Sequence, residues 1–315
     1  MKRLVALSFI GLVTLTVGCS ASQRAQTKVQ RQPLEKQRRE YKTPTNYEHR
    51  DRGYDPKTGK LVTYDHKPRV ELTDEKAGKY AFKWIGYDGK EKAVVFQRGD
   101  VLDVVVSADV SKTSGHQYVY TYTAQNLPTS ATYLKRLIVQ NLAADVMLDK
   151  GGSFMPFTMS NTIFQFREGN WISFDDVSDD VQIDPGQQVQ VRVTSSAPPG
   201  LVECRASIET VINGAGEEMP SALENLLPGY DDFPKGYTIG PVDYLKALSP
   251  QDRIKYVLEK LPQFHALGWI TDESAATYEQ LLRRGDLNQL LIRLDQDFSA
   301  SQITTEVRAI IRGAN

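Results

Sequence analysis

The chain has 315 residues, with 38 basic and 39 acidic side chains, a formal net charge of −1 and 40% hydrophobic residues. This composition is typical of soluble globular proteins and excludes collagen-like, coiled-coil and polytopic membrane proteins. The balanced charge argues against a nucleic-acid binder, which normally carries a basic excess. With two cysteines, a disulfide-rich scaffold is excluded as well.

Residues 1–18 have the pattern of a secretory signal peptide. A basic start, Met1-Lys2-Arg3, precedes an apolar run over 4–17, and the small Gly18 follows. The run is shorter than the about 20 apolar residues that a lone transmembrane helix needs. The order basic, apolar, small therefore predicts a cleaved secretion signal.

Residues 15–19, Leu-Thr-Val-Gly-Cys, resemble the lipobox of bacterial lipoproteins. The resemblance implies cleavage by signal peptidase II before Cys19, a diacylglycerol on its thiol and an acyl chain on its amino group. Several acyl chains make a stable membrane anchor. Ser20, where an Asp would retain such a protein in the inner membrane of enteric bacteria, favours the outer membrane of a Gram-negative cell. The alternative is an ordinary secretion signal with an incidental cysteine.

The segment 19–45 is expected to be a lipidated, flexible tether. It is rich in Gln, Arg and Lys and nearly free of large apolar residues, so it has little to bury against the entropy of ordering. We interpret it as a solvated spacer. The alternative is that its basic residues add about 1 kcal/mol each of attraction to anionic lipid headgroups.

Residues 46–213 are predicted to form an antiparallel Ig-like β-sandwich domain with an N-terminal hairpin. Short period-two stretches alternate with turn residues, such as 54–60 and the hairpin dipeptide Asp88-Gly89. No helical pattern separates them, which argues against a parallel α/β sheet. Residues 118–127, Tyr-Val-Tyr-Thr-Tyr-Thr-Ala-Gln-Asn-Leu, resemble strands of bacterial Ig-like envelope domains.

Cys204 falls on the apolar face of a period-two stretch, together with Val202 and Ala206. This parity predicts a buried small hydrophobic residue rather than a reactive thiol. Because lipid would occupy Cys19, no intrachain disulfide is expected.

A helical module is predicted over 241–315, after a Gly- and Pro-rich connector at 214–240. Ser249-Pro250 starts the first helix, which is expected to end before Pro262. Thr271, Asp286 and Ser301 start three more. The overall fold class is therefore mainly β with an α-helical C-terminal region, in which short amphipathic helices form a bundle or a layer on the sandwich.

Metal-binding and catalytic motifs are missing from the sequence. It has no phosphate loop, nucleophile elbow, His-Glu-x-x-His or Cys-x-x-Cys, and its four histidines lie far apart. The acidic residues Asp175, Asp176, Asp179 and Asp180 make a weak calcium candidate, because carboxylates on a loop suit Ca²⁺. Their spacing fails the EF-hand pattern, and a solvated acidic loop is the favoured interpretation.

An aromatic row is the candidate carbohydrate site. Tyr118, Tyr120 and Tyr122 share one face of a strand, and Trp84 and Trp171 lie on neighbouring strands or turns. Exposed rings would stack on sugars, whereas buried rings would be cross-strand packing. The parity of the strand does not decide between these alternatives.

These observations lead to three hypotheses of function. The preferred one is a non-enzymatic cell-envelope lipoprotein, anchored in the membrane by its lipid, that binds another envelope protein without any cofactor. The second is a carbohydrate-binding module for peptidoglycan or polysaccharide. The third is a hydrolase of envelope polymers with two carboxyl groups about 5–10 Å apart. Nucleic acid is not expected as a partner.

Overall fold

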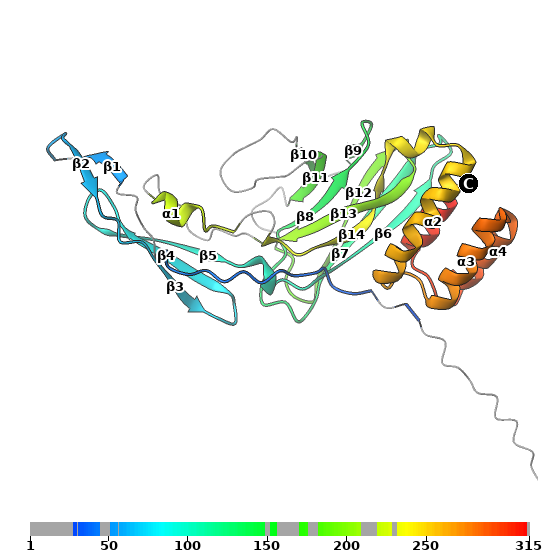
Figure 1. Cartoon of the computed structure of the whole chain (residues 1–315), viewed down its shortest axis with the longest axis horizontal. Helices are drawn as coiled ribbons and strands as arrows, with labels where there is room; N and C mark the ends of the chain where they lie inside the picture. The colour runs from blue at the N-terminus through cyan, green and yellow to red at the C-terminus, as the bar shows by residue number, and fades with distance from the viewer. Residues whose placement is uncertain are drawn as a thin grey trace, which may run out of the picture.

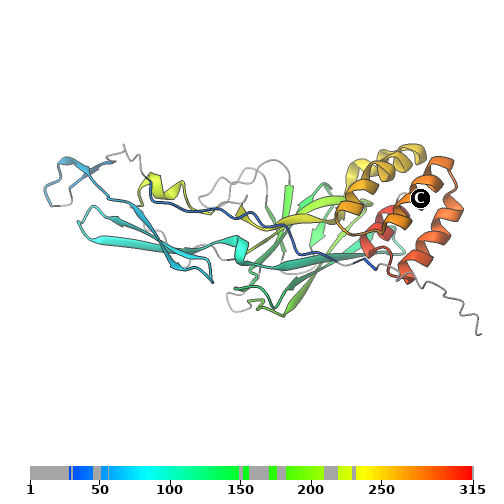
Figure 2. The same cartoon turned by 60° about the horizontal axis from the view of Figure 1, so that its bottom comes forward.

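The protein is elongated, and its parts lie in a row (Figures 1 and 2). The computed structural model describes residues 28–29, 31–44, 51–55, 57–148, 152–155, 170–175, 182–208, 219–228 and 232–313. A small β unit, the distal unit, lies at one end, a β-sandwich in the middle and a helical module at the other end. No helix in these ranges is long and apolar enough to cross a membrane. Cys19 and the predicted signal peptide, residues 1–18, lie outside them.

The sandwich has the strand order of an immunoglobulin domain. One sheet has the order β6-β7-β12-β9 and the other the order β10-β11-β8-β13-β14. When β6, β7, β8, β9, β12, β13 and β14 are lettered A to G, the sheets become A-B-E-D and C-F-G, as in an Ig constant domain. The hairpin β10–β11 extends the second sheet beyond β8. The predicted antiparallel Ig-like β-sandwich followed by helices is confirmed.

The pairings within both sheets are antiparallel, and β7 is a central strand between β6 and β12. One face of β7 packs against the opposite sheet, where the Tyr122 ring lies 5.7 Å from the ring of Phe174 in β11. The sandwich strands are β6 (Val104–Lys112), β7 (Tyr118–Asn126), β8 (Arg136–Asn141), β9 (Met147–Leu148), β10 (Gly152–Met155), β11 (Asn170–Asp175), β12 (Gln188–Ser195), β13 (Pro199–Ser207) and β14 (Lys235–Pro241).

Alternating side chains from both sheets fill the core of the sandwich. Tyr120, Tyr122 and Ala124 of β7 are fully buried, and so is Cys204 of β13. Cys204 lies beside Tyr122, on the two strands that a disulfide joins in antibody domains. The prediction that Cys204 is a buried small hydrophobic residue is confirmed, and burial raises the pKa of its thiol.

The distal unit has a hydrophobic core of its own. Tyr80, Phe82 and Trp84 of β4 pack there with Phe96 of β5 and with Leu223 of α1. The expectation of one β domain over 46–213 is therefore wrong, because this range contributes to two separate cores. The elements of the unit are β1 (Asp51–Tyr54), β2 (Leu61–Tyr64), β3 (Arg69–Asp74), β4 (Lys79–Ile85), β5 (Glu91–Gln97) and α1 (Ser221–Glu224).

Residues 31–44, which we call the strap, connect all parts of the molecule. The strap is the dark blue trace that runs from the helical module past the sandwich to the distal unit (Figures 1 and 2). Leu34 is buried in the sandwich core and Tyr41 in the distal core. Each such side chain contributes about 1.5–3 kcal/mol of burial energy. The expected flexible tether over 19–45 is therefore wrong for the strap.

The expected connector at 214–240 also differs from the structure. Lys235–Pro241 is β14, the last strand of the Ig order, and pairs with β13 along its whole length. Short helix α1 from the same segment packs on the distal unit. Glycines at Gly236 and Gly240 hid this strand in the sequence. A Cβ would lie 2.7 Å from the Leu34 side chain at Gly236 and 2.8 Å from the Val202 side chain at Gly240, so a larger residue would force these side chains to move.

The helical module consists of α2 (Pro250–Ala266), α3 (Asp272–Arg284), α4 (Leu287–Ser299) and α5 (Thr305–Gly313). Ser249, Thr271 and Asp286 cap the first three helices as predicted. The end predicted before Pro262 is wrong, because α2 continues through that residue. The start of the last helix is shifted from Ser301 to Thr305. Helix α5 packs on β6, so the module is a layer against the edge of the sandwich.

Candidate functional site

The aromatic row is not on the surface. Tyr120 and Tyr122 have no exposed area, Trp84 and Trp171 are each 2% exposed, and Tyr118 is partly buried. The tyrosines face the opposite sheet, whereas Trp84 belongs to the distal core. Burial raises the pKa of both Tyr120 and Tyr122. The five residues do not form a sugar-stacking surface, and that prediction is wrong.

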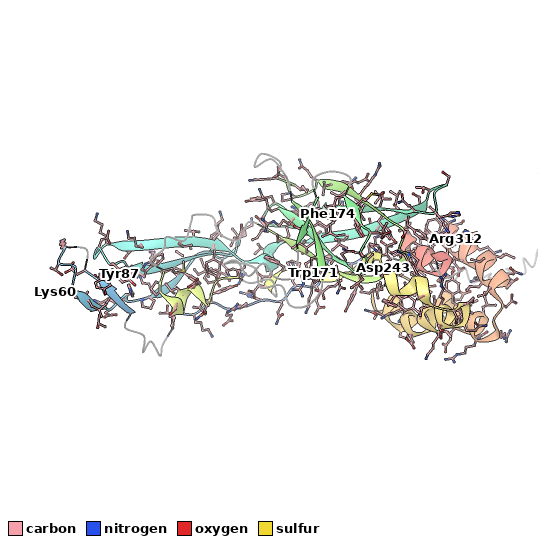
Figure 3. All side chains as sticks on the ribbon, turned by 90° about the horizontal axis from the view of Figure 1, so that it is seen from above. Lys60, Tyr87, Trp171, Phe174, Asp243 and Arg312 are labelled. Carbon is pink, nitrogen blue, oxygen red and sulfur yellow. The ribbon has the colours of Figure 1, made fainter. Side chains whose placement is uncertain are left out.

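The calcium candidate lies almost wholly outside the described residues. Only the backbone of Asp175, at the end of β11, is described, while Asp176, Asp179 and Asp180 fall in the gap between 175 and 182. Over the described ranges, no group of three or more His, Cys, Asp or Glu side chains is placed to hold a metal ion. Figure 3 shows Trp171 and Phe174 of β11 near the middle of the molecule, between Lys60 and Tyr87 at the distal end and Asp243 and Arg312 in the other half.

A polar cluster holds the turn between β12 and β13. Asp145 accepts a hydrogen bond from the Ser195 hydroxyl at 2.6 Å and from the Ser196 amide at 2.9 Å. Lys246 lies 3.8 Å from the same carboxylate. Partial burial raises the pKa of Asp145, but these hydrogen bonds outweigh it and lower the pKa to about 2. Because each group is used within the fold, we interpret the cluster as structural.

A cavity opens where the strap leaves β14. It has a volume of about 540 Å³. Its lining residues are 31–35 of the strap, 235–237 of β14, Val106 of β6, Glu203 of β13, Ala266 at the end of α2, and Leu267 and Trp269 just after that helix. We call it the strap groove. Its size is in the range of ordinary ligand sites.

The strap groove exists because the strap pairs with both sheets and then leaves one of them. Glu35 exchanges two backbone hydrogen bonds with Lys235 of β14, at 2.8 and 2.9 Å. The amide of the preceding Leu34 donates instead to the carbonyl oxygen of Val104 in β6, at 2.8 Å. The next position facing β14 is Pro33, which has no N–H to donate. The pairing with β14 therefore stops after one bridge.

This departure leaves the outer edge of β14 open at Tyr237. The amides of Ala206 and Val242 pair with the carbonyls of Pro234 and Pro198, so the even-numbered positions of β14 face β13. Backbone groups alternate along a strand, and Lys235 accordingly faces outward to the strap. Tyr237 is opposite Glu203 of β13, but its backbone N–H and C=O also point outward and have no strand partner on that side among the described residues. Its side chain is 41% exposed.

A buried ion pair fixes the wall of the groove. Arg31 of the strap contacts the Glu306 carboxylate through both terminal nitrogens, at 2.6 and 3.0 Å. The same carboxylate accepts the backbone N–H of Ala108 at 2.8 Å, and Thr305 donates to the Ala108 carbonyl at 3.1 Å. Side chains of α5 thus replace a neighbouring strand at the edge of β6. Glu306 is fully buried, and its carboxylate is paired with Arg31 and accepts a hydrogen bond from the Ala108 amide.

The lining of the groove is mixed: a few apolar side chains lie at its base, and polar and charged side chains make up more of its surface. Leu34, Val106 and Trp269 are nearly buried below it. Glu35 and Lys235 stand opposite each other at one side and are exposed. This arrangement suits a ligand with an apolar group and a polar backbone better than one that is strongly charged.

Sequence reasoning did not find the groove. Arg31 lies 275 residues from Glu306 along the chain, so no local pattern connects them. Pro33 was the one local signal: a proline in a segment that otherwise pairs marks the place where pairing stops.

Comparisons with known proteins add no function. No protein family and no curated protein matches the chain. One solved structure that matches is an uncharacterized protein from Nocardia farcinica with an immunoglobulin-like fold, at 15% identity and a TM-score of 0.24, covering 44% of this chain and 97% of that one. At this TM-score the match carries no argument. The Ig-like assignment here depends on the strand order alone.

Proposed function

We propose that the protein is a lipid-anchored, non-enzymatic lipoprotein of the bacterial cell envelope that binds another envelope protein. The anchor is inferred from the lipobox-like residues 15–19. The binding role is inferred from the strap groove, which combines an open strand edge with a small apolar area at its base. Carbohydrate binding through the aromatic residues is no longer proposed, because those rings are buried.

The observation that carries the proposal is the fastening of the strap. Val29 donates a backbone hydrogen bond to the carbonyl oxygen of Ser301 at 3.0 Å, and Arg31 is paired with Glu306. The N-terminal part of the described chain therefore first contacts the folded protein at the helical module. Lys28 is nine peptide units from Cys19, a reach of at most about 30 Å. A lipid on Cys19 would therefore keep the helical module near the membrane and direct the distal unit away from it.

Membrane fractionation tests the anchor. The wild-type chain is expected in the membrane fraction, and Cys19→Ala is expected in the soluble fraction with unchanged thermal unfolding. Cys204→Ala serves as the control, since it removes the other cysteine without touching the lipobox. Membrane retention of Cys19→Ala would contradict the proposed anchoring.

Photo-crosslinking in living cells tests the binding role. A photoreactive amino acid at Tyr237 is expected to give a discrete heteromeric adduct, because that side chain stands at the open edge. The same amino acid at Ile292, which is 54% exposed on α4, is the matched control. Equal adducts from both positions, or none from Tyr237, would contradict binding at the groove.

A further inference from the structure

We propose that the strap groove takes an extended segment of a partner polypeptide, which adds to β14 as a new strand and places one apolar side chain at the base of the groove. This inference rests on the proposed function and specifies how the partner is held. It assigns the groove a ligand class, a peptide in β conformation.

The strand edge selects the polypeptide backbone as ligand. Outward-facing N–H and C=O groups on one residue bind the main chain of an added strand, which is the basis of β-strand addition. Tyr237 offers both groups in the mouth of the groove. A lipid chain would leave these groups without partners, which is costly in a partly buried site.

The strap demonstrates that this edge accepts a strand. Its bridge from Glu35 to Lys235 is antiparallel and has two short hydrogen bonds. Pro33, the strap position that would face Tyr237, has no N–H to donate, and the strap turns away there. A partner segment at Tyr237 therefore continues a ladder that the chain itself begins, and an antiparallel direction fits the bridge already present.

The side chains that line the groove indicate which residues the partner segment should carry. Trp269, Leu34 and Val106 give a small apolar area at the base of the groove, which suits one side chain such as Leu, Val or Phe. Arg31 is already neutralised by Glu306, and Glu203 contacts Arg205 at 2.5 Å. Glu35 and Lys235 balance each other at the rim. An apolar residue between uncharged polar neighbours is thus preferred over an acidic or basic run.

The test uses a library of random heptapeptides displayed on phage and selected against the expected mature chain, residues 19–315, carrying Cys19→Ala, which lacks both the lipid and the apolar run over 4–17 and needs no detergent. The expected result is a family of peptides that compete with one another and share a central apolar residue. Synthetic copies are then titrated against variants. Tyr237→Pro removes the outward N–H, and proline is tolerated at such an edge position. It is expected to weaken binding about five- to tenfold, whereas Tyr237→Phe leaves it unchanged.

A second variant keeps the test decisive if Tyr237→Pro fails to fold. Ala266 is exposed and lines the groove, so Ala266→Arg fills the groove without disturbing the core. It is expected to abolish peptide binding. Ala276→Arg, at an exposed position of α3 outside the groove, is the matched control and is expected to bind normally.

Several outcomes would overturn the proposal. These are a selection that enriches no peptide, peptides that bind Tyr237→Pro and Ala266→Arg as tightly as the parent, and displacement of bound peptide by a fatty acid. Self-association lost in Tyr237→Pro would assign the edge to a second copy instead. If Cys19→Ala releases the protein and Tyr237 still crosslinks to a partner, the proposed function holds and only strand addition fails.

Discussion

Replacing Arg31 with alanine leaves the Glu306 carboxylate buried without its cation. Two charge-assisted hydrogen bonds, at 2.6 and 3.0 Å, are lost, while the Ala108 N–H remains as a donor. Removing one partner of a buried ion pair typically costs 3–5 kcal/mol. The Arg31 side chain is 28% exposed, so water can enter where it stood, and we expect the lower limit, about 3 kcal/mol. Urea unfolding of the full chain measures this loss.

The double variant separates the charge from the packing. In Arg31→Ala with Glu306→Gln, a neutral amide still accepts the Ala108 N–H, and no buried charge is left unpaired. The double variant is therefore expected to be more stable than Arg31→Ala alone. Hydrogen exchange should show the loss first in α5, which this carboxylate fastens to β6. A cost below about 0.5 kcal/mol for Arg31→Ala, or a double variant less stable than the single one, would refute the reasoning.

Three further predictions concern the sandwich. Tyr120→Phe removes a buried hydrogen bond of 2.6 Å to the Ala197 carbonyl, and the free energy of unfolding in urea should fall by about 1–2 kcal/mol. Tyr122→Phe is the control and should lower it less, because the Tyr122 hydroxyl has no hydrogen-bond partner within the described residues. The pKa of Asp145 is lowered to about 2, so its contribution to the free energy of unfolding is present above its ordinary pKa near 4 and is lost as pH falls from 4 to 2. The free energy of unfolding of Asp145→Asn should therefore depend less on pH across that range than that of the wild type. An equal pH dependence in both proteins would contradict this. The Cys204 thiol, with its raised pKa and full burial, should react with a thiol reagent only after unfolding, and rapid labelling of the native protein would refute its placement.

Local signals predicted the elements well because their causes are local. The Asp88-Gly89 turn joins β4 to β5, with Gly89 at a φ of 75° that favours glycine. Helix caps at Ser249 and Thr271 accept the expected backbone amides. Pro262 is the exception: packing of α2 against the sandwich and α3 outweighs one lost backbone hydrogen bond.

Properties set by distant parts of the chain were not predictable from the sequence. The parity of β7 placed Tyr120 and Tyr122 on one face, but only the opposite sheet decides that this face is buried. Leu34 and Tyr41 are enough to hold the strap in place, because each side chain packs into a core formed by other segments. A segment of low hydrophobicity was therefore ordered by its partners rather than by its own composition.

The two β cores could not be distinguished for a similar reason. Strands of the distal unit and of the sandwich have the same period of two, and the sequence gives no pairing partners. The groove was not predictable for the same two reasons. It requires the pairing partners of β14 and the position of the strap, and it forms between the strap, β14 and the end of α2, which are distant in sequence.

Mass spectrometry of the N-terminal peptide of the protein, purified from membranes of its native host, tests the central claim most directly. The account predicts a mature chain that begins at Cys19 and carries the mass of a diacylglycerol on that residue, with or without a further acyl chain. An N-terminus at another position, or an unmodified Cys19 in membrane-derived protein, would contradict lipid anchoring and the orientation of the groove and distal unit that follows from it.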